Sequence, residues 1–145
     1  MPHDAAAAET WEHFRHGADI GIRGSGATMV QAFEQAALAL TAVVTEPDTV
    51  RALQAVDIHC SSPDNDFLFL DWINALIYEM ATRGMLFRRF VLTREGAALH
   101  GTAWGEPVDV ERHRPAVEPK GATLTELKVE QASDGRWIAQ CVVDV

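Results

Sequence analysis

Apolar and polar positions in the first part of the chain follow three successive patterns. Aromatic and β-branched residues run through 11–23 into a cluster of glycines, which predicts a strand followed by a loop. Thr28 and Gln31 form a capping-box pair and the apolar residues after them recur at helical spacing, so a helix is predicted over about residues 28–44. Residues 54–60 alternate between apolar and polar, as in a strand with one buried face. The glycines of the predicted loop are Gly21, Gly24 and Gly26.

The second part of the chain is predicted to contain one long helix and two β-hairpins. Ser62-Pro63 precedes the helix, which covers about residues 64–82 and ends at Gly84. This helix is apolar around most of its circumference, so it should pack on two sides. Favoured turn dipeptides, Glu95-Gly96 and Asp134-Gly135, mark the hairpins. They join strand 86–93 to 97–104, and strand 123–132 to 136–143.

The order strand, helix, strand, helix and then four strands predicts an α+β fold, in which a mainly antiparallel β-sheet packs with two α-helices. The 145 residues, 48% of them hydrophobic and 23% charged, suit a single compact folded domain. We assign this domain to residues 11–145 and predict a flexible, alanine-rich tail over 1–10. The most apolar stretch, 67–81, is too short and too polar to span a bilayer, so no membrane segment is expected.

Charge narrows the range of partners. Lys and Arg number 12 and Asp and Glu number 21, which leaves a net charge of −9 that repels phosphate backbones. We therefore expect no autonomous nucleic-acid binding, whereas divalent cations and basic proteins would be attracted. Cys60 and Cys141 lie in apolar runs and are predicted to be reduced core residues, which suits a cytoplasmic location.

The densest group of polar residues lies within 11–19 and contains Glu12, His13, His16 and Asp19. In an extended segment Glu12 and His16 share one face while His13 points to the other, so the two histidines cannot bind one ion locally. Simple hydrogen bonding at a strand end competes with a transition-metal site as the role of these histidines. Asp19 stands where the strand meets the glycines, and it either presents a carboxylate beside open backbone or caps the turn.

The end of the chain is a second unusual feature. A strand that is apolar on both faces runs directly into Asp144 and Val145. Such a strand is usually central in its sheet, so its end should bring the Asp144 carboxylate and the terminal carboxylate of Val145 to one edge. Calcium, magnesium and manganese prefer oxygen donors of this kind, and a third acidic residue with water would complete a site. The alternative is a solvated chain end.

Residues 104–113 place several titratable side chains around a proline turn, and we expect them to form a solvated connection: Glu106, Asp109, Glu111 and His113. The sequence shows no Ser/His/Asp or Cys/His arrangement, no glycine-rich phosphate loop and no paired-cysteine metal spacing. The residue patterns alone therefore do not point to a catalytic site.

Four segments resemble the archease family, in the order and at the spacing of that family. Residues 11–22 (WEHFRHGADIGI) are similar to its opening motif and 71–78 (DWINALIY) to its second helix. Residues 104–113 (WGEPVDVERH) resemble its middle signature, and Asp144-Val145 resembles its terminal pair. The resemblance covers the whole predicted domain.

This resemblance implies a non-catalytic activator of the RtcB-type tRNA-splicing ligase, an RNA ligase that uses GTP and manganese to join exons. Archeases promote guanylylation, which is the transfer of GMP from GTP to the active-site histidine of that ligase. They thereby allow multiple turnover and can broaden the ligase's nucleotide use. GTP would thus be used by the partner ligase, while this chain would bind a divalent ion: calcium or, in function, manganese or magnesium.

The family's pattern also implies roles for individual residues. Three would bind the metal ion through oxygen: Asp19, Asp144 and Val145. Lys120 matches the family's functional lysine and would contact a nucleotide phosphate or a carboxylate of the ligase. Three others would surround the metal ligands without binding the ion: Glu12, His13 and His16.

The chain departs from the family at Gly17, where threonine is usual, and at Thr123-Leu124-Thr125, where Thr-Tyr-His is common. If the missing groups seat Lys120 or orient the metal, this chain activates its partner less well or binds a different ion. Two functions of other classes also remain open. One is a stand-alone metal-dependent phosphoesterase that uses the polar group within 11–19, and the other is a general chaperone or scaffold.

Overall fold

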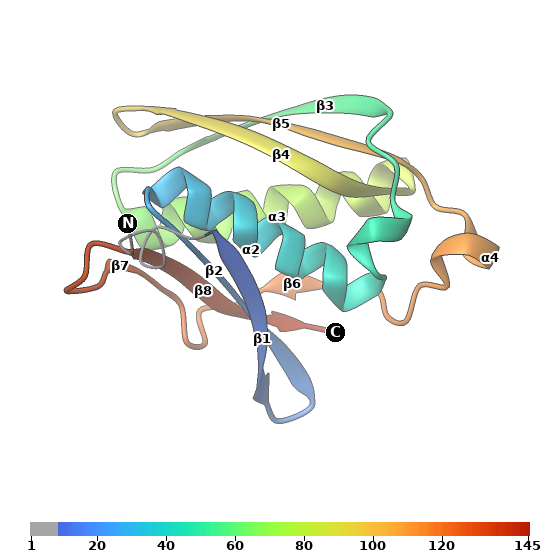
Figure 1. Ribbon diagram of the computed structural model, residues 1–145, viewed down its shortest axis with the longest axis horizontal. Helices are drawn as coiled ribbons and strands as arrows, with labels where there is room; N and C mark the ends of the chain where they lie inside the picture. The colour runs from blue at the N-terminus through green and yellow to red at the C-terminus, as the bar shows by residue number, and fades with distance from the viewer. Residues whose placement is uncertain (1–8) are drawn as a thin grey trace, which may run out of the picture.

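The computed structural model describes residues 9–145, and it shows two antiparallel β-sheets with two long helices between them (Figure 1). The five-stranded sheet has the order β1–β2–β8–β6, and β7 also pairs with β8. Its strands are β1 (Thr10–His16), β2 (Asp19–Gly26), β6 (Gly121–Ala122), β7 (Lys128–Gln131) and β8 (Trp137–Asp144). The three-stranded sheet has the order β3–β5–β4, with strands β3 (Gln54–Ser61), β4 (Met85–Glu95) and β5 (Ala98–Pro107).

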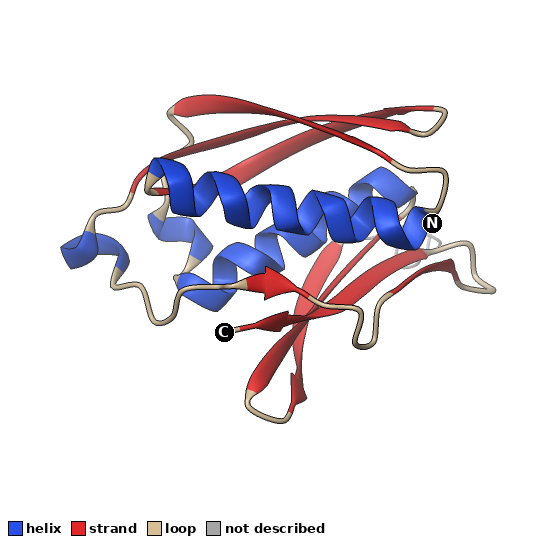
Figure 2. Cartoon of the chain, turned by 180° about the vertical axis from the view of Figure 1, so that it is seen from behind, coloured by secondary structure: helices blue, strands red, loops and turns tan. Residues whose placement is uncertain are grey.

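The helices α2 (Met29–Val44) and α3 (Asn65–Arg83) fill the space between the sheets, as the view from behind in Figure 2 also shows. Helix α2 packs on β1, β2 and β8 of one sheet and on β4 of the other, while α3 packs on β3 and β4 and on β6 to β8. This confirms the predicted α+β class and the two-sided packing of the second helix. The strands form two sheets because helices that are apolar on both sides can bury a sheet on each. Two short helices, η1 (Pro47–Thr49) and α4 (Val110–His113), lie in connections.

Local signals position both long helices where the sequence predicts them. Thr28 caps α2, because its hydroxyl accepts a hydrogen bond from the Gln31 N–H at 3.2 Å. The carboxylate of Asp64 caps α3 in the same way, accepting from the Phe67 N–H at 3.0 Å. Gly84 ends α3 in the left-handed region at φ 61°, where glycine has no Cβ to clash.

The first segment is a complete hairpin, so the prediction of one strand followed by a glycine loop is wrong. The turn lies at residues 17–18, and the three glycines sit inside β2. A Cβ on Gly24 would lie 2.2 Å from the Ala32 carbonyl oxygen of α2. Glycine is therefore required in the middle of this strand because the backbone of α2 lies directly on it.

The predicted strand over 123–132 is also wrong in part, because only β7 lies within it and the short strand β6 precedes it. Residue Glu126, between them, adopts φ 56° and interrupts the extended backbone. Side chains of α3 take over the hydrogen bonds of this sheet edge: Asn74 accepts from the Ala122 N–H at 2.8 Å, and Asp66 accepts from the Val129 N–H at 2.7 Å. The edge is thus closed by a helix rather than by another strand.

Residues 1–8, most of the predicted tail, lie outside the described residues, and Thr10 already pairs with Ser25 in the five-stranded sheet. Cys141 is buried and Cys60 is half-buried, and both are free thiols. Burial raises the pKa of Cys141 to about 12 and that of Cys60 to about 11. Over residues 9–145, no helix combines the length and the hydropathy needed to cross a membrane.

Candidate functional site

The residues predicted to bind a metal ion lie where two neighbouring strands meet one edge of the five-stranded sheet. Strand β2 begins at Asp19 and β8 ends at Asp144, and the antiparallel register pairs Ile20 with Val143. One step back along β2 from Ile20 is Asp19, and one step on along β8 from Val143 is Asp144. The register therefore places Asp19 beside the end of β8. The Val145 N–H donates to the Asp19 carboxylate at 3.4 Å, so Asp19 and Val145 are in direct contact.

The oxygen donors at this edge suit a hard cation. Asp144 is exposed, whereas Asp19 and Val145 are half-buried. Among residues 9–145, no cluster of three or more His, Cys, Asp or Glu side chains could hold a metal ion, so a site here needs an oxygen of Val145 as its third donor. Two carboxylates and a backbone or terminal oxygen form an oxygen-only set, which fits calcium, magnesium or manganese and is a poor match for zinc or copper.

Lys120 is tied to the same edge through its main chain. Its N–H donates to the Asp144 carbonyl oxygen at 2.8 Å, and the following residue, Gly121, pairs with Asp144 as β6 begins. The Lys120 side chain is exposed and forms no ion pair with another described residue. The carbonyl of Asp144 is thus occupied, while its carboxylate stays available.

The three residues expected around the metal ligands are separated by the pleat of β1, as the alternation predicts. His13 faces α2, where its Nε2 hydrogen-bonds with the Ala39 carbonyl oxygen at 2.8 Å. Glu12 faces the opposite side and forms an ion pair with Arg23. His16 pairs in register with Asp19 across the hairpin turn and is exposed. Of the three residues, only His16 is paired in register with a candidate ligand, Asp19. The three side chains therefore do not converge on one centre.

A second polar cluster lies at the end of β5, where the sequence predicted only a solvated connection. Glu106 is 5% exposed, and its carboxylate accepts two hydrogen bonds from the Arg112 guanidinium, each at 2.8 Å. It also accepts from the Arg51 N–H at 2.8 Å and lies 3.0 Å from Nε2 of His113. These donors, with the Arg112 contacts the strongest, lower the pKa of Glu106 to about 2. The prediction of a solvated connection is wrong for this part of the chain.

His113 has a defined tautomer in this cluster. The Asp109 N–H donates to Nδ1 of His113 at 2.8 Å, so Nδ1 is an acceptor and Nε2 carries the proton that it donates to Glu106. The Thr45 hydroxyl donates to the His113 carbonyl oxygen. These contacts anchor α4, from which the chain continues toward Lys120.

Comparisons with known proteins decide the family. A model of the Archease protein family (MTH1598/TM1083) matches residues 11–145. The chain belongs to the archease family. Protein archease from Pyrococcus furiosus is 38% identical over 139 residues, which cover 93% of this chain and 98% of the relative. Protein archease from Methanosarcina acetivorans is 33% identical over 140 residues, which cover 93% of this chain and 95% of the relative.

A solved structure agrees with this assignment. The solution structure of Methanobacterium thermoautotrophicum protein 1598 superposes with a TM-score of 0.75 at 28% identity. The superposition covers 93% of this chain and 98% of that one, so it includes both sheets and both long helices. The resemblance of the sequence to the archease family is therefore confirmed across the whole fold.

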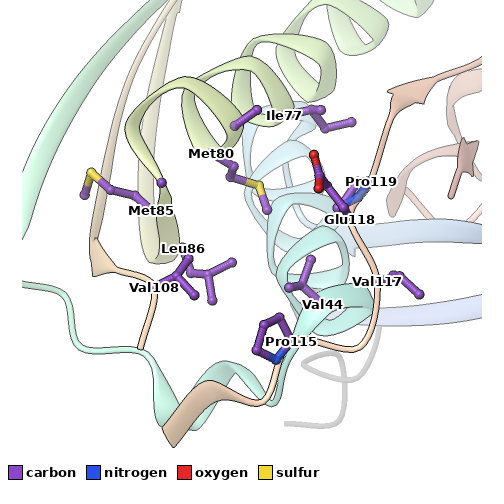
Figure 3. A pocket seen from close by; sticks show the side chains of 12 residues that line it. Val44, Ile77, Met80, Met85, Leu86, Val108, Pro115, Val117, Glu118 and Pro119 are labelled. Carbon is purple, nitrogen blue, oxygen red and sulfur yellow. The ribbon is translucent and has the colours of Figure 1, made fainter. Parts of the chain in front are cut away.

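This archease-family chain also has an apolar cavity of about 270 Å³, which the sequence analysis missed (Figure 3). Side chains from α2, α3, β4 and the connection after α4 surround it, including Val44, Met80, Leu86 and Val117. Glu118 supplies the one carboxylate of its lining, and Pro119, also in the lining, directly precedes Lys120. No periodic pattern marks this cavity because segments far apart in the sequence form it, including Val108 after β5.

Proposed function

We propose that this chain is a non-catalytic, metal-binding activator of an RtcB-type RNA ligase, promoting guanylylation of the ligase in tRNA splicing. Membership of the archease family supports the class of function. The observation that carries the proposal is the contact between Asp19 and Val145 beside Asp144, which places oxygen donors from both ends of the fold at one edge. The group within 11–19 does not converge on a common centre, so the phosphoesterase alternative gains no support.

The metal ion would be held by the carboxylates of Asp19 and Asp144 and by a main-chain or terminal oxygen of Val145. When bound, it would supply positive charge to offset the charge that develops on the phosphates of GTP. The chain's own residues hold and orient the ion, while the reacting histidine belongs to the ligase. Calcium, manganese and magnesium all fit this donor set.

Lys120 would provide a second positive charge next to the ion. Its backbone is fixed by the hydrogen bond to the Asp144 carbonyl, while the ammonium stays exposed at the end of a flexible stem. It is one of only two lysines, the other being Lys128 in β7. We propose that Lys120 contacts a nucleotide phosphate or a carboxylate of the ligase.

Single-turnover guanylylation of an RtcB-type ligase with labelled GTP tests this function. The assay compares the ligase alone with the ligase plus this protein, as wild type, Asp144→Ala and Lys120→Ala. Asp48→Ala is a matched control, because Asp48 has a 93% exposed side chain at a distance in the chain from the candidate ligands. We expect wild type and Asp48→Ala to accelerate GMP transfer, and Asp144→Ala to be inactive.

Two outcomes would contradict the proposal. If Asp144→Ala stimulates as well as wild type, the acidic edge is not the acting site. If stimulation survives chelation of divalent ions bound to this protein before mixing and extends to unrelated client proteins, a chaperone or scaffold explains the family better. A melting curve for each variant separates loss of function from loss of fold.

A further inference from the structure

A polar groove of about 370 Å³ lies on the face of the five-stranded sheet that is turned away from the helices. Its floor is a row of residues in register across four strands: Glu12 of β1, Arg23 of β2, Gln140 of β8 and Lys128 of β7. Ser25 and Arg136 also line it. Register pairing places these side chains on one face, because Ile22 and Ala139 of the same strands are buried against the core.

Arg23 is held in place on three sides. Its Nε donates to the Gln140 side-chain oxygen at 2.8 Å, its Nη1 is paired with Glu12, and its guanidinium lies 4.7 Å from the centre of the Phe14 ring. Gln140 is fixed in turn, since its Nε2 donates to the Glu126 carbonyl oxygen at 3.0 Å. These contacts leave Nη2 of Arg23 as a donor of fixed orientation.

Arg136 contributes a donor that lacks an acceptor. Its Nε is buried and has no hydrogen-bond partner within the part of the chain that the structure describes. The nearby Asp134 carboxylate already accepts from the Arg136 backbone N–H at 3.0 Å. A buried N–H without an acceptor is unfavourable, so an oxygen ligand at this point would remove a cost of the unliganded state.

The groove therefore has more donors than acceptors. Arg23, Lys128 and Arg136 line it, and each keeps N–H groups that no described residue accepts, although the Lys128 ammonium also lies 3.6 Å from the Glu130 carboxylate. One oxygen of the Glu12 carboxylate and one of the Asp134 carboxylate are already engaged by Arg23 and by the Arg136 backbone N–H. The missing partner is a group that carries several acceptor oxygens and negative charge. A chain with a net charge of −9 places three of its 12 basic residues here, which makes this groove a local exception to the acidic surface.

We propose that this groove binds a phosphate group, with the Arg23 and Arg136 guanidiniums and the Lys128 ammonium as its donors and the Ser25 hydroxyl as a further contact. Hydrogen bonds from a guanidinium to a phosphate oxygen are charge-assisted and strong, and Nη2 of Arg23 and Nε of Arg136 are the donors available for them. The site is separate from the Asp19–Asp144 edge and does not depend on the function proposed above. Three sources supply such a group: inorganic phosphate, a nucleotide and the backbone of a nucleic-acid strand. The experiment below distinguishes them.

The test is a titration of the ¹⁵N-labelled full chain by NMR, with inorganic phosphate as the first probe and the arginine Nε–H signals as the readout. We expect saturable shifts of the Arg23 and Arg136 signals, and weakening of the apparent affinity by about tenfold in Lys128→Gln and in Arg136→Gln. Lys128 is exposed, so Lys128→Gln should fold even if Arg136→Gln does not. Arg15→Gln, on β1 with its side chain on the opposite face, is the matched control and should bind as wild type does.

Further arms distinguish the source of the phosphate. Tighter binding of GMP than of phosphate points to a nucleotide, tighter binding of a short RNA points to a strand, and equal binding points to free phosphate; each outcome supports the site. Linear, unsaturated shifts in every titration would overturn it, as would equal affinities of wild type, Lys128→Gln and Arg136→Gln.

Discussion

Two sets of acidic residues in this molecule lie in opposite surroundings: one carboxylate is buried and paired, and two others lie at a sheet edge without a cationic partner. Glu106 is buried, and Arg112, His113 and the Arg51 backbone N–H supply donors to it. Asp19 and Asp144 lie at a sheet edge, and none of the ion pairs among the described residues includes either carboxylate. The first group is paired with donors inside the fold, whereas the second has no cationic partner among the described residues.

This difference distinguishes a carboxylate that stabilises the fold from a carboxylate that is free to bind a cation. A carboxylate whose acceptor sites are all filled by the protein stabilises the fold and has no capacity left for a cation. A carboxylate that is placed by the backbone but left unpaired contributes little to folding and can bind an ion. The contrast predicts that substitutions at Glu106 change stability and that substitutions at Asp144 change binding.

The largest effect is expected from Glu106→Gln. The amide cannot replace the charged contacts to Arg112, so the free energy of unfolding should fall by about 3 kcal/mol. Urea denaturation followed by circular dichroism measures it, with Glu111→Gln, an exposed residue of α4, as the control. Equal stability of the two variants would show that the Glu106 cluster does not hold the fold.

Acid should remove the same contribution. The pKa of Glu106 is lowered to about 2 in the folded state and is near its ordinary value in the unfolded chain. The unfolded chain binds the proton first, so this stability is complete above about pH 5 and declines as the pH falls, by about 2 kcal/mol at pH 3. Denaturation curves between pH 6 and about pH 3 should show this component in wild type and not in Glu106→Gln. Parallel acid losses in both proteins would contradict it.

Divalent cations should produce a smaller effect at the other acidic group. An ion that binds only the folded state adds roughly 1.4 kcal/mol when its free concentration is ten times its dissociation constant. Calcium or manganese should therefore raise the melting temperature of wild type and of Asp48→Ala, but not that of Asp144→Asn. Calorimetric titration gives the dissociation constant, and identical constants for wild type and Asp144→Asn would place the ion elsewhere.

The smallest effect is expected from Asp144→Asn without metal. The Asp144 side chain is exposed and its carbonyl bond to Lys120 is kept, so the free energy of unfolding should change by less than about 0.5 kcal/mol. Urea denaturation in the presence of a chelator measures it. A loss as large as that of Glu106→Gln would mean that Asp144 is a structural residue, and the contrast between the two groups would fail.

Sequence reasoning succeeded wherever the deciding contacts are local. The cap at Thr28, the end of α3 at Gly84 and the turn dipeptides all act over a few residues. The interpretation of β8 as a central strand was also correct, because an apolar pattern on both faces requires neighbours on both sides. It is this central position that places Asp144 beside Asp19.

Sequence reasoning failed where a distant element sets the conformation. The glycines of β2 look like a loop until α2 is seen to lie on Gly24. The break between β6 and β7 lies between Ala122 and Val129, whose N–H groups donate to Asn74 and Asp66 of α3. The carboxylate of the buried Glu106 accepts from the N–H of Arg51, which is distant in the sequence. None of these contacts leaves a periodic signal in its own segment.

By itself, the sequence determined the positions of both long helices, the α+β class, the family resemblance and the choice of Asp19, Asp144, Val145 and Lys120 as candidates. These follow from local hydrogen bonding, hydrophobic periodicity and motif order, which a linear chain displays directly. Only the tertiary structure decided that the strands form two sheets, that Glu106 is paired in the interior, and that Arg23, Lys128 and Arg136 share one groove. Each of these depends on which distant groups meet, and that is set by the packing of whole elements against one another.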